Sequence, residues 1–258
     1  MTEKLAKSDW WRSFHVIEMA DLFLDRPEAQ VEKTTEFLSK VLRLNEGDYV
    51  FDQCCGIGTV ALNFAKKGFV TTGVDLCQIY IDRAVESVAQ QNLTSEFHCA
   101  DGFEFVPSKI CDGVFNWYSS FGYAETDLQN KKMLTCAFES LKPGGYYALD
   151  VPNIPSLLRG FQRHLVRTGT SAGNHVTCVR ESEIDLKNGL LVQNWQWLVE
   201  GREIDQRQSS LKIYMPHRLV EMLSAVGFEG VELFGDTDGA ALSIDSARLI
   251  VVARKPFQ

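Results

Sequence analysis

Two glycines, Gly56 and Gly58, follow directly after the apolar segment 49–53. Glycines allow the backbone to approach a ligand closely, and a helix that starts at such a turn presents free N–H groups to that ligand. Asp75 closes the next apolar segment, 70–74, where its carboxylate can accept hydrogen bonds from both hydroxyls of a ribose. Together these residues predict a binding site for a cofactor that contains ribose.

Two kinds of cofactor fit this pattern. Gly56, Gly58 and Ala61 satisfy a relaxed form of the dinucleotide-binding pattern, so a nicotinamide-dependent oxidoreductase is one interpretation. The aromatic segment 116–123 and the Pro-Gly-Gly segment 143–145 disfavour it.

The elements that must position these residues are strands and helices in alternation. Short apolar runs alternate with amphipathic stretches from residue 48 onward, as a parallel sheet with crossover helices requires. Two helices are expected before the sheet, within 14–43, separated at Pro27. We expect strands at 49–53, 70–74, 96–99, 113–117 and 146–151, helices at 59–67, 79–90 and 128–141, and a short helix near Phe103.

The alternation then stops, and three extended segments follow. Residues 176–185, 190–200 and 207–214 predict an antiparallel insert, and Lys187-Asn188-Gly189 is a strong hairpin signal between the first two. A helix at 216–226 and strands at 231–234 and 247–253 complete the core. We divide the chain into N-terminal lid helices (1–45), a cofactor-binding core (46–155), the insert (156–214), which would cap the substrate or form a dimer contact, and the completion of the core (215–258).

Taken together, the segments after the third, fourth and fifth strands carry a resemblance. With Ala100-Asp101-Gly102, the segment 116–123 and Leu141-Lys142-Pro143-Gly144-Gly145, the chain resembles the class I S-adenosylmethionine-dependent methyltransferases over essentially its whole core. The resemblance implies a doubly wound α/β fold with a seven-stranded, mostly parallel Rossmann-like sheet, S-adenosyl-L-methionine as cofactor and S-adenosyl-L-homocysteine as product.

The resemblance also implies where the cofactor binds. The glycine turn would hold the amino-acid end of the cofactor, Asp75 the ribose, Asp101 or Gly102 the adenine, and Asn116 the methionine part. The turn departs from the family's commonest pattern at Gln53 and at Cys54-Cys55, where another glycine often stands; we interpret the cysteines as small packed residues rather than redox groups. The predicted cofactor ligands are Trp11, Asp52, Cys54, Gly56, Gly58, Asp75, Leu76, Asp101, Gly102 and Asn116.

The segment 116–123 resembles the corresponding stretch of small-molecule and amino-sugar N-methyltransferases, where it walls the space between cofactor and acceptor. Trp195 and Trp197 face one side of their extended segment, and this row would cap the pocket, form a homodimer interface or pack on a sheet edge. Trp10 and Trp11 would either close over the cofactor by cation–π attraction or pin the first helix. The predicted substrate ligands are Trp10, Trp117, Tyr118, Phe121, Tyr123, Asn153, Arg159 and Trp197.

Methyl transfer places few demands on acid or base groups, because the protein mainly fixes distance and angle and excludes water. A hydroxyl acceptor more often needs a base than an amine does. His15 is the base candidate, because the resemblance puts the N-terminal helix over the cofactor, and Tyr118 is the second predicted catalytic residue. Arg159, His164 and Arg202 are candidate contacts for an anionic substrate.

Composition limits the classes of molecule that the protein is expected to bind. The net charge is −8, whereas nucleic-acid binding needs a basic face. The basic residues within 159–167 form a short cluster, which we interpret as a solvated helix face. Seven cysteines without a Cys-x-x-Cys pair argue against structural zinc and a disulfide framework, so we expect no metal and a cytoplasmic protein. No apolar stretch has the length of a membrane span, so no membrane partner is expected.

These observations predict a biosynthetic enzyme that moves a methyl group to a nitrogen of a small metabolite. O-methylation is the alternative, and a nicotinamide oxidoreductase or a non-catalytic scaffold are further alternatives. A homodimer is one assembly that the sequence allows.

Overall fold

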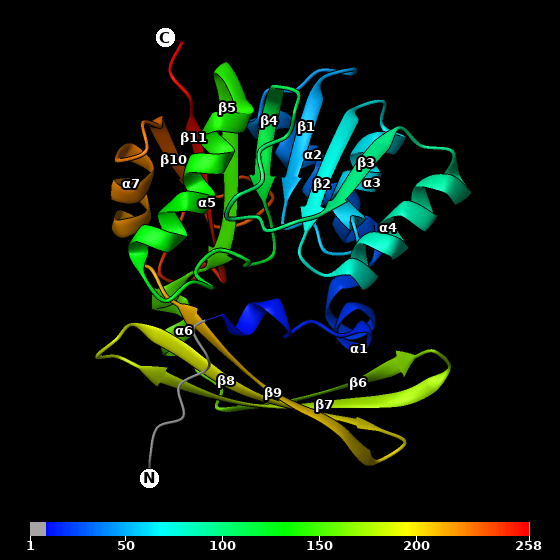
Figure 1. Ribbon diagram of the computed structural model, residues 1–258. Coiled ribbons are helices and arrows are strands. Elements are labelled where there is room, and N and C mark those ends of the chain that lie inside the picture. Colours follow the sequence, from blue (N-terminus) through cyan, green and yellow to red (C-terminus); the bar gives the residue numbers. More distant parts are fainter. Residues whose placement is uncertain (1–8, 258) are drawn as a thin grey trace.

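A seven-stranded sheet forms the centre of the computed structural model, which describes residues 9–257 (Figure 1). The strand order is β10-β11-β5-β4-β1-β2-β3, and only β11 runs antiparallel to its neighbours. This confirms the expected doubly wound, mostly parallel sheet. The strands are β1 (Tyr49–Gln53), β2 (Val70–Asp75), β3 (Ser95–Cys99), β4 (Cys111–Asn116), β5 (Leu141–Pro152), β10 (Glu229–Phe234) and β11 (Arg248–Arg254).

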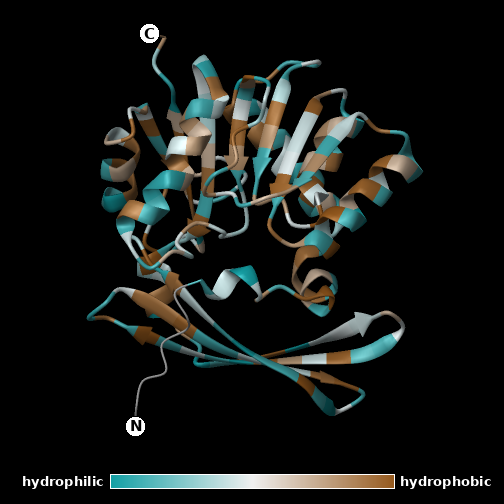
Figure 2. Cartoon of the chain, in the orientation of Figure 1, coloured by the Kyte–Doolittle hydropathy of each residue, from teal (hydrophilic) through white to brown (hydrophobic). Residues whose placement is uncertain are grey.

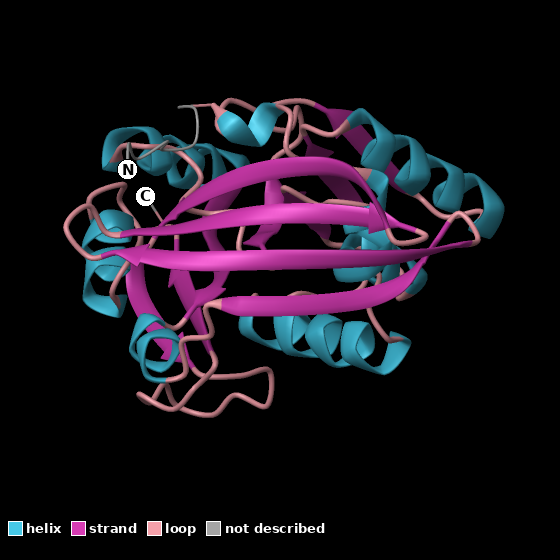
Figure 3. Ribbon diagram, turned by 90° about the horizontal axis from the view of Figure 1, so that it is seen from below, coloured by secondary structure: helices cyan, strands magenta, loops and turns pink. Residues whose placement is uncertain are grey.

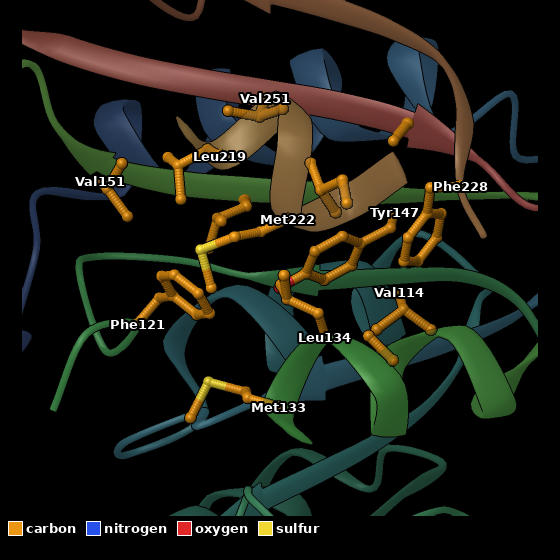
Figure 4. Close-up of a cluster of buried hydrophobic side chains, with 14 of the residues drawn as sticks. Val114, Phe121, Met133, Leu134, Tyr147, Val151, Leu219, Met222, Phe228 and Val251 are labelled. Atoms are coloured by element: carbon orange, nitrogen blue, oxygen red, sulfur yellow. The ribbon is translucent and has the colours of Figure 1, made fainter. Parts of the chain in front are cut away.

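Helices cover both faces of this sheet, because the strands are apolar on both sides. On one face the side chains of Val114, Tyr147 and Val251 belong to a buried cluster with Met133 and Met222 from two helices, which is drawn in Figure 4. On the other face the next residue of each strand packs against two further helices. The first face is covered by α5 (Asp127–Ser140) and α7 (Pro216–Ser224), and the second by α2 (Glu28–Val41) and α3 (Thr59–Lys66), with α4 (Gln78–Gln91) beside α3.

A second, antiparallel sheet lies below the carboxyl ends of the core strands (Figure 1). Its four strands lie side by side in the order β6-β7-β8-β9 when seen from below (Figure 3), and the predicted hairpin at 187–189 joins β7 to β8. Figure 2 shows hydrophobic and hydrophilic residues interspersed along these strands. The strands are β6 (His164–Ser171), β7 (Asn174–Asp185), β8 (Leu190–Val199) and β9 (Arg202–Lys212).

The N-terminal segment lies between the two sheets (Figure 1). Only the second of the two expected helices is regular: α2 begins directly after Pro27. The first is a succession of single turns, η1 (Trp10–Arg12), α1 (Ile17–Met19) and the π-helical η2 (Ala20–Leu24), because its residues pack against β9 and β6 rather than along one helix face.

Three local expectations are wrong. Residues near Phe103 form one turn, not a helix, because the backbone N–H groups of Glu104 and Phe105 both bond to the carbonyl of Asp101 and none continues the pattern. Strand β5 begins at Leu141 rather than at residue 146, so the Pro-Gly-Gly segment belongs to the strand and not to a connection between helix and strand.

The third concerns the basic positions of 159–167, which do not share a helix face. Arg159 ends the short helix α6 (Ile154–Arg159), whereas His164 and Arg167 lie on β6. This strand had no apolar signal, because it is a sheet edge with mostly exposed side chains. Among residues 9–257, no helix is long and apolar enough to cross a membrane.

Candidate active site

A cavity of about 550 Å³ separates the two sheets. The loops after β1 and β4, the end of β2 and the N-terminal segment line its upper part, and strands β7, β8 and β9 line its floor. Since the carboxyl ends of β1 and β4 meet here, this is the edge at which α/β sheets bind ligands.

The turn after β1 has the backbone shape of a glycine-rich loop. Gly56 and Gly58 have φ values of 57° and 76°, and Cys54 has a φ of 63°, in the left-handed region that favours glycine. The thiol of Cys54 occupies space beside Gly102: a β-carbon at Gly102 would lie 2.7 Å from its Sγ. The unusual cysteine is therefore accommodated by the absence of a side chain at Gly102.

Asp75 is anchored at the edge of the cavity by two backbone groups. Its Oδ2 accepts a hydrogen bond from the Gly56 N–H and its Oδ1 accepts one from the Cys77 N–H, both at 2.9 Å. Each carboxylate oxygen has a second lone pair, so the group retains acceptor capacity for a ligand. Among the described residues no Lys, Arg or His pairs with it within salt-bridge distance, so its charge is available to the cavity.

Asp52 lies at the same edge, with a nearly fully buried carboxyl group. Burial raises its pKa well above the usual range, and the nearby negative charge of Asp75 raises it further. A cationic ligand beside these two groups would favour the ionised form of Asp52. This end of the cavity is therefore suited to positive charge.

His15 lines the cavity between aromatic side chains. Its ring centroid lies 5.7 Å from that of Tyr80 and 6.3 Å from that of Tyr123. Burial lowers the pKa of His15, although Asp75 opposes the shift, so the imidazole is neutral near pH 7. A neutral imidazole can accept a proton.

The aromatic loop after β4 depends on two residues that the sequence analysis missed. Tyr118 and Ser119 have φ values of 65° and 75°, and Asp150 on β5 accepts a hydrogen bond from the Tyr118 N–H at 3.1 Å. Arg248 on β11 bonds both oxygens of Asp150 and the hydroxyl of Ser119. The available signal was one charged residue in each of the two otherwise apolar strands expected at 146–151 and 247–253.

Tyr118 places its ring under the guanidinium of Arg26, 4.7 Å from the ring centroid. Burial raises the pKa of the Tyr118 phenol, so the hydroxyl stays protonated and can only donate or accept a hydrogen bond as the neutral form. Arg26 also lines the cavity and was not predicted from sequence. It is one of two cavity arginines without a carboxylate partner among residues 9–257; the other is Arg180.

The first turn, η1, is fixed by contacts that Trp10 and Trp11 make on opposite sides. Trp10 donates a hydrogen bond from Nε1 to the Ser210 carbonyl at 3.1 Å, and its ring centroid lies 4.8 Å from that of Tyr123. Trp11 packs on Phe103, with 5.6 Å between the ring centroids. Trp10 therefore lines the cavity, whereas Trp11 lies beside it.

Part of the predicted site is gathered at the cavity. The residues that line it are the following members of the predicted cofactor, catalytic and substrate sets: Trp10, His15, Asp52, Cys54, Gly56, Asp75, Trp117, Tyr118 and Tyr123.

The remaining predicted cofactor ligands lie outside the lining. Gly58 packs under Phe97, where a β-carbon would come within 2.7 Å of the ring. Asn116 is buried and donates to the sulfur of Met133 at 3.3 Å, while its Oδ1 has no partner among the described residues. Of the expected adenine contacts, Leu76 packs against the apolar cluster that contains Trp11, Gly102 lies against Cys54, and Asp101 forms an ion pair with Arg12 at 2.6 Å.

Four predicted substrate ligands are likewise away from the cavity, each with a structural partner. Phe121 packs against Tyr214, with 5.5 Å between the ring centroids. Asn153 donates to the carbonyls of residues 243 and 246. Arg159 pairs with an aspartate at the surface. Trp197 is fully buried, and its ring stacks against that of Trp195.

The aromatic row of the insert faces the core of its own chain. Trp195 and Trp197 stack with an interplanar angle of 9°, and both rings contact Phe23 edge-on. Trp195 also lines the cavity, next to Leu191 and Gln193. The row therefore lines the cavity only in part, because Trp197 is not in the lining, and its role as a substrate cap or a dimer contact stays a prediction.

Comparison with known proteins agrees with this arrangement. Residues 50–145 match the family model described as a methyltransferase domain. The chain is 32% identical over 127 residues to the S-adenosyl-L-methionine-dependent Diels-Alderase iccD of Talaromyces variabilis, and this match spans 47% of the chain and 42% of that protein. A putative methyltransferase of Geobacillus sp. (strain WCH70) is 24% identical over 80% of the chain and 84% of its own length.

Solved structures share the fold over most of the chain. The CcbJ methyltransferase of Streptomyces caelestis superposes with a TM-score of 0.75 at 19% identity, over 89% of this chain and 97% of that one. The sugar N-methyltransferase KedS8 of Streptoalloteichus sp. gives a TM-score of 0.69 at 16% identity, over 89% and 87%. Residues 50–145 thus match a methyltransferase domain, and the chain shares the fold of these S-adenosylmethionine-dependent and sugar N-methyltransferase structures.

Proposed function

We propose that the protein transfers a methyl group from S-adenosyl-L-methionine to a nitrogen of a small-molecule metabolite. The observation that carries this proposal is the cavity that joins the turn after β1 and Asp75 to the aromatic face of the insert. Cofactor and acceptor would meet inside it, away from bulk water.

The residues present fit such a cofactor. The start of α3 at Thr59 offers backbone N–H groups for its carboxylate, and the free lone pairs of Asp75 suit its ribose hydroxyls. The unpartnered Oδ1 of Asn116 and the buried carboxyl of Asp52 suit its positively charged groups. When bound, the cofactor supplies a methyl group on a positively charged sulfur.

At the adenine end we retain Leu76, Asp101 and Gly102, with Trp11, as proposed contacts. Arg12 pairs with Asp101 at this position, and its side chain is half exposed. We propose that this side chain moves aside when adenine enters, since an exposed ion pair is weak.

The acceptor that we propose is a small molecule rather than nucleic acid. The cavity is closed over by the insert and aromatic in its lining, and the net charge of −8 disfavours contact with phosphate backbones. KedS8, a sugar N-methyltransferase, shares the fold, which is consistent with a nitrogen acceptor. A homodimer remains a prediction.

One observation favours O-methylation as the second candidate. His15 is a neutral imidazole in the cavity and can take the proton of a hydroxyl acceptor. An amine that arrives unprotonated needs no such group.

The first test is isothermal titration of the purified protein with S-adenosyl-L-methionine, S-adenosyl-L-homocysteine and NAD in parallel. Binding of both adenosyl compounds, followed by methylation of members of an amine panel detected by mass spectrometry, is expected. Binding of NAD alone would contradict the proposal. Methylation of alcohols but not amines would select the second candidate.

A further inference from the structure

Arg180 is a cation without a counter-charge inside the cavity. It lies on β7 opposite Trp195 of β8, on the face of the insert that is turned toward the core. Among the described residues no carboxylate pairs with it and no acceptor bonds its N–H groups, and its Nε is buried without a partner. Its guanidinium lies 5.0 Å from the centroid of the Trp195 ring.

The ring of Trp195 compensates only part of this burial. A cation–π contact attracts the charge but bonds none of the donors in the plane of the guanidinium. Burial lowers the pKa of Arg180, and no carboxylate opposes that shift. Its Nε is buried without a partner among residues 9–257 and the side chain lines the cavity, so donors that none of these residues bonds are available to a ligand there.

The surroundings of Arg180 are neutral and polar. Ser182, Gln193 and Ser209 lie on the same face of the insert and also line the cavity. Gln193 donates to the hydroxyl of Ser182 at 3.2 Å, and Trp195 donates to the hydroxyl of Ser209 at 2.9 Å. One cation among uncharged hydroxyl and amide groups suits a single negative charge.

The two ends of the cavity therefore differ in sign. Asp52 and Asp75 lie at the core edge, whereas Arg180 comes from the insert across the cavity. Arg26, the other cavity arginine without a carboxylate partner, lies on the ring of Tyr118 in the loop after β4, at the core side of the cavity. Of these two arginines, Arg180 is the one that the insert contributes.

We propose that the acceptor is a monoanion with a carboxylate group, which Arg180 binds while Trp195 and the neighbouring apolar residues hold the body of the molecule. This inference rests on the proposed function, because it names the class of acceptor of that same cavity. A planar guanidinium binds a carboxylate through two parallel hydrogen bonds, which also fixes the orientation of the acceptor.

The test uses two probes of the same shape, 4-aminobenzoate and 4-aminobenzamide, titrated into protein saturated with S-adenosyl-L-homocysteine. The acid is expected to bind about tenfold more tightly than the amide, the gain from a charge-assisted hydrogen-bonded pair. Arg180→Gln is expected to remove that preference and to leave the affinity for the amide and for S-adenosyl-L-homocysteine unchanged.

Arg167→Gln is the matched control. Arg167 also lies over an aromatic ring, 4.8 Å from the centroid of Phe23, but it is exposed on β6 and does not line the cavity. This variant should keep the preference for the acid. A preference that survives in Arg180→Gln, or is lost equally in Arg167→Gln, contradicts the assignment.

The wild-type comparison alone is decisive if Arg180→Gln does not fold. Equal affinities for acid and amide, or no binding of either at millimolar concentration, would overturn the inference. The proposed function is judged separately by the binding of the adenosyl compounds, which uses the other end of the cavity.

Discussion

Arg248 and Asp150 form a two-point ion pair between β11 and β5, with Nε 2.8 Å from Oδ1 and Nη2 2.6 Å from Oδ2. Asp150 is almost fully buried, and it also accepts the backbone N–H of Tyr118. The pair thus connects the last strand of the core to the left-handed segment that walls the cavity. We infer that it positions Tyr118 and Ser119 at the cavity.

Replacing Arg248 by Met should leave the Asp150 carboxylate buried with too few donors. We expect a loss of about 2 kcal/mol in the free energy of unfolding, the range for hydrogen bonds to charged groups. We also expect a higher KM for the acceptor, with little change in kcat or cofactor affinity, measured by urea unfolding and steady-state kinetics. Arg254→Met is the control. Arg254 lies on the same strand as Arg248 and forms an exposed ion pair with Glu229 of β10, so its loss should have little effect on stability or on KM.

Replacing Asp75 by Asn should weaken the binding of S-adenosyl-L-methionine by about tenfold to a hundredfold, because charged acceptors for the ribose hydroxyls are lost. Isothermal titration measures this directly. Asp82→Asn, an exposed aspartate on α4 that bonds only Gln78, should bind the cofactor like the wild type. Unchanged affinity in Asp75→Asn would remove the ribose assignment.

Replacing Asp52 by Asn should make the free protein more stable near neutral pH. The pKa of Asp52 is raised in the folded state, so the favourable contribution of the protonated group to the free energy of unfolding is fully present below the unfolded pKa of about 3.9 and is lost as pH rises through the folded value. Asparagine does not ionise, so the variant does not lose stability in this way. Thermal unfolding across this pH range should show a gain that grows with pH.

The same carboxyl group should couple cofactor binding to a proton. A cationic ligand favours ionised Asp52, so binding should release a proton and tighten as pH rises toward the raised pKa. Titrations in two buffers of different ionisation enthalpy measure the release. Asp52→Asn should abolish it, and an equal release from this variant would assign the proton to another group.

Replacing His15 by Ala distinguishes the two acceptor types. For a base-assisted reaction we expect kcat to fall by about a hundredfold or more, whereas an amine acceptor should lose much less. Because the pKa of His15 is lowered, the wild-type rate of a base-assisted reaction should decline only below the ordinary histidine pKa of about 6.5. Normal binding of S-adenosyl-L-homocysteine by the variant is the control, because it shows that a change in kcat comes from catalysis and not from a loss of folding or cofactor binding.

Local patterns predicted most of the core. Apolar strands, the glycines after β1 and Asp75 at the end of β2 are each recognisable from a few neighbouring residues, and the structure agrees. The Asp150–Arg248 pair joins positions 98 residues apart, so no local pattern contains it. The one charged residue in each of the expected strands 146–151 and 247–253 was the indication that the sequence offered.

The floor of the cavity was harder to predict for a related reason. Arg180 lies among alternating polar and apolar residues, and only the fold decides which alternate set faces inward. Gly58 shows the opposite case: it belongs to the expected motif, but its missing side chain makes room for Phe97 rather than for a ligand.

The second sheet has a consequence for how such a protein diversifies. In strands β7, β8 and β9, alternate positions line the cavity over part of their length: Arg180, Ser182, Leu191, Gln193, Trp195, Ser209 and Leu211. Exchanges at these inward positions would reshape the lower part of the cavity while Asp52, Asp75 and the turn after β1 keep their surroundings. Under the proposed function, a library confined to these positions would change acceptor choice and leave cofactor affinity unaltered.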